Sequence, residues 1–289
     1  MLQQLVAAIR AAYIAYMMSS RHLVDKPLST YHHPVADQLF TQLSSSTSGI
    51  FVHWGVYESG KSTAAKQAAW RLQEEAGRTV ILLDGFNFIC LGKPIREQFK
   101  FLVGVSETSS EPVATFYSKP TTVIIDNFDV LMYEKRECEA LEFLQELSAE
   151  SVETQKFNVL LILTPWEQAV QLREKGYTVI APSAKWSEEQ LHALFSTLPE
   201  SLQNKWKDEN SKSELLRLAA ISGTPGDLLF GVRGEKVSEK RAWLLAEEWR
   251  KGGKALDESC ATKEKMEEEG RFPDKNGIFH WEDLAKMAK

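Results

Sequence analysis

The stretch of sequence that decides the fold is Gly55-Val56-Tyr57-Glu58-Ser59-Gly60-Lys61-Ser62. It matches the pattern G-x-x-x-x-G-K-[ST] at every fixed position, with an apolar run at 50–54 before it and an alanine-rich stretch after it. Glycines let the backbone close around an anion, so that successive N–H groups point at it, and the positive end of the following helix adds to the attraction. The stretch therefore predicts a phosphate-binding loop (P-loop) between a strand and a helix.

Two side chains of this loop have predicted roles of their own. Lys61 can reach the β- and γ-phosphates of a nucleotide as a point charge, and the Ser62 hydroxyl can ligate Mg²⁺. The other residues contribute mainly backbone. The predicted nucleotide-binding residues of the loop are Gly55, Val56, Tyr57, Glu58, Ser59, Gly60, Lys61, Ser62 and Thr63.

A second carboxylate is expected at the end of a buried strand. Three aliphatic residues lead to Asp126, and a carboxylate at the carboxyl edge of a parallel sheet can hold the water shell of Mg²⁺. Its distance from the P-loop, with a predicted strand and helix between them, favours a Walker B assignment. Ser62 and Asp126 are thus the predicted magnesium ligands.

The residues that follow these strands bear on hydrolysis. Asn127 stands where many ATPases have a glutamate, and an amide cannot act as a general base; Asp129 is the nearest substitute. Two interpretations stay open: a slow or switch-like ATPase, which we favour slightly, or an active one that uses Asp129. Thr164 ends another apolar run and can sense the γ-phosphate or orient water, or it merely caps the next helix. The candidate catalytic residues are Lys61, Asp126, Asn127, Asp129 and Thr164.

Around these motifs, short apolar runs alternate with helical stretches, as in βαβ units with a parallel sheet. We expect strands at 50–54, 79–84, 122–126, 159–164 and 178–181 and helices at 62–76, 138–151 and 166–175. Beyond Ser187 only helices are expected, at 188–197, 202–207, 213–221 and 236–252. The predicted fold class is therefore α/β: a P-loop NTPase with a parallel sheet flanked by helices, followed by a smaller all-helical lid domain.

The predicted domain organisation has four parts. They are an N-terminal helix and connector at 1–48, the α/β core at 49–186, the lid at 187–253, and a charged tail with an apolar end at 254–289. Within the connector, 36–43 is expected to form a short helix, and 103–121 reads as a loop or irregular insertion. The run 2–18 has helical periodicity but contains Arg10 and is shorter than a membrane span. A helix packing on the body is favoured, with a partner-binding helix, a membrane-surface helix and a targeting peptide as alternatives.

Composition limits the remaining classes. Hydrophobic residues make up 43% of the chain and charged residues 26%, with a formal net charge of −6 and a pI near 5.7, so no global basic field points to nucleic acid. Cys90, Cys138 and Cys260 form no disulfide framework, and no transition-metal site is expected. We expect an intracellular protein of a reducing compartment, cytoplasm or nucleus, with organelle targeting left open and membrane association disfavoured.

Over 49–233 the chain resembles the AAA+/STAND branch of P-loop ATPases. Walker A, Walker B and a sensor-1-like Thr164 stand in the family's order, and 222–227 looks like the turn that opens the sensor-2 helix of the lid. The resemblance implies that Pro225 in this turn lies near the nucleotide base and couples nucleotide binding to lid position. The sequence is also similar to the ATPase portion of crinkler-type effector proteins, in which such a module accompanies a nuclease-like domain. No complete set of nuclease residues is visible in this sequence.

The departures from that family pattern are informative. Family members often carry an arginine just after the proline, where this chain has Gly226-Asp227, and Arg233 is a weak substitute. Arg173 lies where an arginine finger would reach a neighbouring subunit, although a lone helical arginine is usually a solvated charge. These gaps disfavour rapid ring-shaped motors and favour a nucleotide switch.

Three functions from different classes follow. The first is a Mg²⁺-dependent, ATP-binding protein acting as a slow ATPase or nucleotide switch, with ATP preferred because no guanine-reading Asn-Lys-x-Asp run is present. The second is a nucleotide-gated module that binds a protein partner, or another copy of itself, through its terminal helices. The third is a nucleic-acid-associated ATPase using the basic and aromatic residues of 235–250, where interspersed glutamates favour an ordinary solvated helix. Whether the chain is an enzyme is left open, and a kinase is disfavoured.

Overall fold

The computed structural model describes residues 31–89, 93–105, 112–113, 117–133, 136–180, 185–206, 208–235 and 237–268. The predicted N-terminal helix at 2–18 and the apolar end of the predicted tail lie outside these residues.

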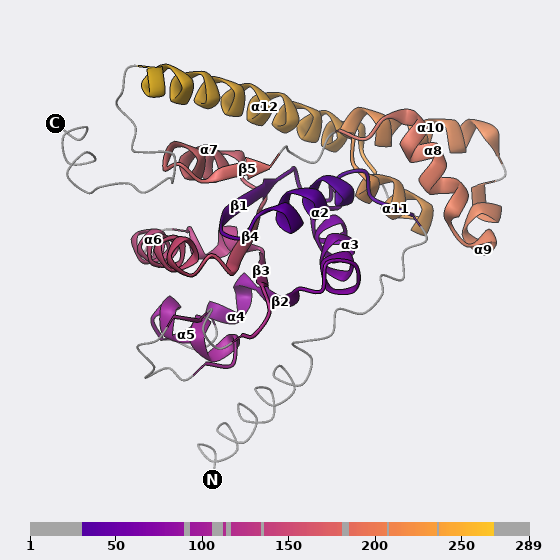
Figure 1. Ribbon diagram of the computed structural model, residues 1–289. Helices are drawn as coiled ribbons and strands as arrows, with labels where there is room; N and C mark the ends of the chain where they lie inside the picture. The colour runs from indigo at the N-terminus through magenta and orange to yellow at the C-terminus, as the bar shows by residue number, and fades with distance from the viewer. Residues whose placement is uncertain are drawn as a thin grey trace, which may run out of the picture. The chain divides into compact units, whose positions relative to one another are not determined.

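A parallel sheet confirms the predicted fold class. Its strands run in the order β2-β3-β4-β1-β5, and the pairs β2–β3, β3–β4 and β1–β5 are parallel (Figure 1). Every residue of β4 is buried, as expected for an almost wholly apolar strand in a sheet covered on both faces. All the strands lie within two residues of the predicted bounds: β1 (Gly49–Trp54), β2 (Thr79–Asp84), β3 (Thr121–Asp126), β4 (Phe157–Leu163) and β5 (Thr178–Ile180).

The chain divides into two compact units, and the first comprises Phe40–Ile50 and Ala68–Leu161 of the described residues. It holds β2, β3 and most of β4, with α6 (Glu137–Thr154) where a helix was predicted. Two short helices, α4 (Gly85–Ile89) and α5 (Ile95–Leu102), were not predicted. The second of these is amphipathic, and its buried Phe99 packs edge-on against Phe143 at 5.2 Å between ring centroids.

Two buried polar side chains hold the carboxyl end of α2 (Ala36–Ser45), the short helix predicted in the connector. Arg78 Nη1 and Asn158 Nδ2 each donate to the carbonyl oxygens of Leu43 and Ser46, at 2.9–3.1 Å. These carbonyls lie at a helix end and have no partner within the helix, so the two donors satisfy them.

The second unit comprises Pro27–Leu39, Phe51–Gln67 and Ile162–Lys289, of which the structure describes 31–39, 51–67 and most of 162–268. It holds the whole of the loop Gly55–Ser62, together with β5 and the helices from α7 (Trp166–Glu174) onward. Within the described part of 185–268 there is no strand, as predicted. The helices are α8 (Glu188–Thr197), α9 (Glu200–Gln203), α10 (Glu209–Ser222), α11 (Pro225–Arg233) and α12 (Glu239–Glu268), with a 3₁₀ turn at Asn204–Trp206.

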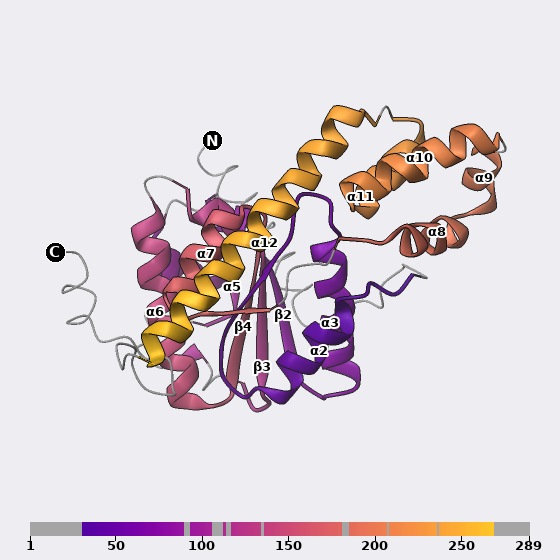
Figure 2. The ribbon, with the colours of Figure 1, turned by 90° about the horizontal axis from the view of Figure 1, so that it is seen from above.

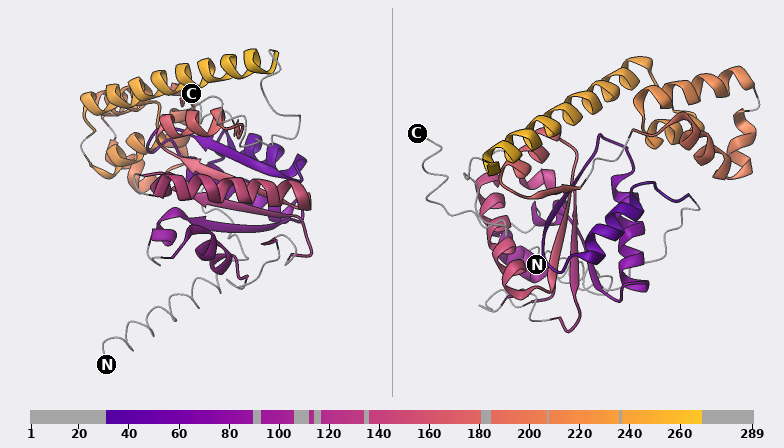
Figure 3. Two further views of the ribbon diagram at one scale, coloured as in Figure 1. Left: turned by 90° about the vertical axis from the view of Figure 1, so that its left-hand side faces the viewer. Right: turned by 45° about the horizontal axis from the view of Figure 1, so that its top comes forward.

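The last helix differs from the prediction. It was expected to end at 252, but α12 continues to Glu268 and lies along α7, while α8, α10 and α11 gather beside its amino-terminal end (Figures 2 and 3). Gly252 and Gly253 do not interrupt it, because tertiary packing can outweigh the low helix propensity of glycine. The proposed start of a charged tail at 254 therefore falls inside a helix.

The lid helices begin and end at recognisable caps. Ser187 forms a capping box with Gln190 at the start of α8, Gly223 ends α10 in a left-handed conformation with φ 66°, and Thr224 with Pro225 opens α11. These caps allow short helices to enclose a separate core. That core consists of Trp186, Leu191, Leu194, Phe195, Leu215, Leu216, Ala219, Leu228 and Val232.

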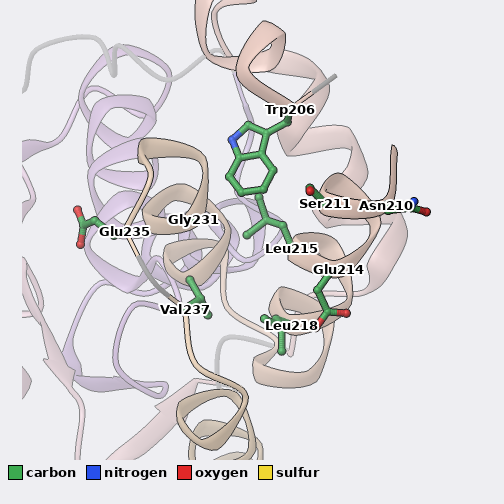
Figure 4. A pocket seen from close by; sticks show the side chains of 9 residues that line it. All are labelled: Trp206, Asn210, Ser211, Glu214, Leu215, Leu218, Gly231, Glu235 and Val237. Atoms are coloured by element: carbon green, nitrogen blue, oxygen red, sulfur yellow. The ribbon is translucent and has the colours of Figure 1, made fainter. Parts of the chain in front are cut away.

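A hollow of about 490 Å³ lies on the helical lid (Figure 4). The Trp206 ring stands over Leu215 at its floor, while Asn210 and Glu235 lie at opposite sides. Close packing of α10 on α11 shapes it, since a Cβ at Gly231 would come within 2.1 Å of Leu215 Cδ1.

None of the helices in the described part of the chain combines the length and the apolar character needed to cross a membrane.

Candidate nucleotide-binding site

The predicted phosphate-binding loop joins β1 to α3 (Lys61–Glu74). Glu58 and Gly60 have left-handed φ values of 64° and 89°, and a Cβ at Gly60 would lie 2.7 Å from His33 Nε2. Only glycine avoids both the strain and that contact. The loop thus turns sharply into the amino-terminal end of a helix of 14 residues, whose free N–H groups and dipole favour an anion.

The lysine of the motif lies back over the loop. Lys61 Nζ donates to the carbonyl oxygens of Gly55 and Val56 at 2.7 and 2.9 Å. Its side chain is buried, as is Ser59, while Tyr57 is exposed and Thr63 lies on the exposed side of α3. The ammonium group therefore lies against the backbone of the phosphate-binding loop.

A histidine that the sequence analysis did not single out supports the loop. His33 Nε2 is 3.1 Å from Ser59 O and His33 Nδ1 accepts from the Val35 N–H at 3.2 Å, which places the ring proton on Nε2. The His33 N–H donates to Gln67 Oε1 in α3 at 2.8 Å. Burial lowers the pKa of His33, so the ring is a neutral donor to the loop.

The predicted sensor-2-like turn lies against the same loop. The Gly226 N–H donates to the Glu58 carbonyl oxygen at 3.2 Å, and Pro225 Cγ is 3.5 Å from the Cβ position of Gly60. A Cβ at Gly226 would lie 2.3 Å from Glu58 Cβ, so only glycine permits this approach. The first turn of α11 is thereby in contact with the phosphate-binding loop.

An arginine from α12 lies at this junction instead of the residues considered from the sequence. Arg241 Nε donates to Asp227 Oδ1 at 2.8 Å, and Arg241 Nη2 makes a short ion pair with Glu58 Oε2. Arg233, the weak substitute suggested above, is exposed at the end of α11. The sequence placed Arg241 only in the basic stretch 235–250, because its proximity to the loop depends on how α12 packs beside α11, which no local pattern reveals.

The end of β1 is enclosed by tryptophans. Trp54 Nε1 donates to the Thr164 carbonyl oxygen at 2.8 Å, and the Trp249 ring of α12 packs edge-on against Trp54 with centroids 5.5 Å apart. Thr164 therefore lies beside the strand that leads into the P-loop, as predicted. The N-cap of α7 is Pro165, so Thr164 does not cap that helix.

Two other features singled out in the sequence, Arg173 and the stretch 235–250, make contacts within the chain. Arg173 Nη1 donates to the Leu256 carbonyl oxygen of α12 at 3.1 Å, so this nitrogen has a partner within the chain. In 235–250, Arg241 pairs with Glu58, Trp249 donates to Ser222 O at 3.1 Å, and Arg250 pairs with Glu247. Of the residues considered for a nucleic-acid surface, Arg241 and Trp249 make contacts within the molecule, whereas Lys240, Trp243 and Arg250 stay exposed.

The acidic strand ends belong to the first unit. Asp126 ends β3 directly beside Asp84, which ends β2 in the parallel register. Asn127 has φ 53°, its N–H donates to Asp126 Oδ1 at 3.0 Å, and its Nδ2 donates to Asp84 Oδ1 at 3.2 Å. Asp129 lies in the 3₁₀ helix Phe128–Leu131. Asp84 was recognised only as the end of a strand, although a carboxylate there was a signal of a second acidic strand end.

The residues of the loop fit the phosphates of a nucleotide. In the described residues no three His, Cys, Asp or Glu side chains gather as a metal cluster. Mg²⁺ bound with a nucleotide needs only one or two protein oxygens, since the phosphates and water supply the others. The loop turns into the start of α3, whose first two residues are Lys61 and Ser62. A turning backbone, a lysine and a hydroxyl at a helix start are the groups that a triphosphate requires.

No protein-family model matches the chain, and no curated protein matches it either. Among solved structures, it is similar to a chain of the HORMA:CdnC:Trip13 complex of E. coli MS115-1, at 14% identity and a TM-score of 0.49, over 82% of this chain and 91% of that one. It is also similar to domain III of the Thermotoga maritima replication initiation protein DnaA (16%, TM-score 0.43, 78% and 94%). A third is the Walker-type ATPase PABY2304 of Pyrococcus abyssi (12%, TM-score 0.46, 81% and 76%).

Proposed function

We propose that this chain binds ATP with Mg²⁺ at the loop Gly55–Ser62 and acts as a nucleotide switch or slow ATPase of the AAA+/STAND type. The observation that carries the proposal is the conformation of that loop. It turns through left-handed Glu58 and Gly60 into the start of α3, with the Lys61 ammonium group at its mouth. The order of the motifs along the chain supports the family assignment, and the cysteine usage supports a reducing compartment.

Each residue has a proposed role in binding. The N–H groups from Glu58 to Thr63 hold the phosphates, and the Lys61 ammonium group neutralises the β- and γ-phosphates. Ser62 and Asp126 are the proposed ligands of Mg²⁺, directly or through water. The metal, when bound, neutralises phosphate charge and raises the electrophilicity of the γ-phosphorus.

Slow hydrolysis is proposed because of what stands beside Asp126. Asn127 cannot accept a proton from water. Its side-chain amide donates to Asp84, and its backbone is in the left-handed conformation. Besides Asp126 itself, Asp129 lies two residues beyond Asn127, and Asp84 lies on the neighbouring strand. If one of them activates water, removing it will lower turnover without lowering nucleotide affinity.

The test is to measure Mg²⁺-ATP binding and phosphate release side by side on the wild type and on Lys61→Ala, Ser62→Ala, Asn127→Glu, Asp129→Ala and Asp84→Asn. We expect ATP binding with little turnover in the wild type, loss of binding in Lys61→Ala, loss of the Mg²⁺ dependence in Ser62→Ala, and a gain of turnover in Asn127→Glu.

The outcomes separate the possibilities. Brisk hydrolysis by the wild type that disappears in Asp129→Ala or Asp84→Asn overturns the switch and leaves a working ATPase. Absence of ATP binding in every variant, the wild type included, overturns the proposed function itself.

A further inference from the structure

The phosphate-binding loop carries an acidic side chain. Glu58 lies within Gly55–Ser62, and its side chain is only 12% exposed. A carboxylate in the loop opposes a bound triphosphate, because like charges at short range in a poorly solvated site repel strongly. The chain therefore needs a compensating cation at this position if the loop binds nucleotide.

Other carboxylates near Glu58 add to the negative charge at the loop. Burial raises the pKa of Glu58, the hydrogen bond and charge of Arg241 oppose that rise, and the charges of Asp227 and Glu235 add to it. Asp227 is fully buried at the first turn of α11. Around the loop the described residues thus present several carboxylates and one guanidinium group in direct contact with two of them.

Arg241 is suited to that position. Its Nε and Nη2 atoms contact Asp227 and Glu58 separately, and its guanidinium carbon lies 5.6 Å from the centre of the Phe230 ring. Because Asp227 and Phe230 belong to α11 and Arg241 to α12, the lid determines where the cation stands. The loop contributes only Glu58.

On the basis of the proposed function, we propose that Arg241 is a positioning residue for nucleotide binding, which sets affinity by neutralising Glu58 of the phosphate-binding loop. Arg241 acts through Glu58 and not by direct contact with the phosphates. Its removal leaves an uncompensated carboxylate beside the bound nucleotide. Removal of Glu58 as well makes the arginine dispensable for nucleotide affinity, although the buried Asp227 still loses its partner.

The proposal makes a charge-dependent prediction. A Coulombic penalty from Glu58 grows with the number of phosphates, so loss of Arg241 should weaken ATP more than ADP and ADP more than AMP. A lid that merely loosens would weaken all three alike. We expect Arg241→Met to reduce Mg²⁺-ATP affinity about tenfold at low salt, with a smaller loss at high salt because the repulsion is screened.

The experiment is a double-mutant cycle on the full chain with Arg241→Met, Glu58→Gln and both together, using calorimetric titration with Mg²⁺-ATP, ADP and AMP. Arg241→Lys keeps the charge and should retain most of the affinity. Lys240→Met, at the exposed neighbouring position, is the matched control and should bind as the wild type does. Thermal unfolding without nucleotide shows whether each variant is folded.

We expect Glu58→Gln to restore ATP affinity in the Arg241→Met background to within about twofold of Glu58→Gln alone, as a double-mutant cycle shows for two residues acting through one interaction. Equal losses for ATP, ADP and AMP, or a loss that persists after Glu58→Gln, overturn the proposal. If the wild type binds ATP and Arg241→Met binds it equally well, this inference fails while the proposed function stands. If the wild type does not bind ATP, the proposed function fails first.

Discussion

At the scale of single residues, His33 and His53 lie buried around the phosphate-binding loop and strand β1, and neither accepts a proton easily. Burial lowers the pKa of His33, and burial together with the Lys61 charge lowers the pKa of His53 to about 3. In the unfolded chain both would titrate near 6.5. Between the folded and unfolded values the unfolded chain binds more protons, so stability is full above about pH 6.5 and is lost as the pH falls below it.

This predicts a falling free energy of unfolding from pH 7.5 to pH 5, measured by urea denaturation. Each buried histidine contributes a slope of up to about 1.4 kcal/mol per pH unit once the pH is below 6.5. In His33→Gln the slope should flatten by one group's share. An unchanged slope in His33→Gln would show that His33 is protonated in the folded protein.

The residues that could be predicted from the sequence are those whose chemistry is set by neighbours along the chain. Gly60, Lys61 and Asp126 belong to this group, since each stands at the end of a strand or the start of a helix that periodicity reveals. His33 and Arg241 could not be assigned in this way. Their contacts join segments far apart in sequence, as when Arg241 pairs with Glu58 across 183 positions.

At the scale of the helices, α12 illustrates the same limit. Its amphipathic start predicts a helix, but the glycines at 252 and 253 and the charged residues after them suggested an end. The structure continues the helix because Gly252 lets it approach the strand end closely. A Cβ there would lie 2.3 Å from Trp54 Cη2 and 2.8 Å from Trp166 Cβ. The same substitution at Gly253 would meet no atom within 4 Å.

The two neighbouring glycines therefore predict opposite effects of the same substitution. Gly253→Ala should stabilise the protein by about 0.5–1 kcal/mol, because alanine favours the helix and the site is open. Gly252→Ala should destabilise it by about 1–3 kcal/mol, since the buried indole cannot move aside. Denaturation midpoints of both variants test this, and stabilisation by Gly252→Ala would mean that α12 does not pack on Trp54.

For the whole molecule, nucleotide binding should appear as stabilisation, because a ligand that binds only the folded chain raises its free energy of unfolding. At a ligand concentration of 100 times Kd the gain is about 2.7 kcal/mol, which for a chain of this length raises Tm by about 5 °C. We expect this shift with Mg²⁺-ATP in the wild type and in Lys66→Ala, whose side chain is exposed on the same helix as Lys61. Lys61→Ala should abolish it, since that ammonium group lies at the loop itself. A shift of equal size in Lys61→Ala would mean that the nucleotide binds away from Gly55–Ser62. The roles proposed for the loop residues would then be wrong.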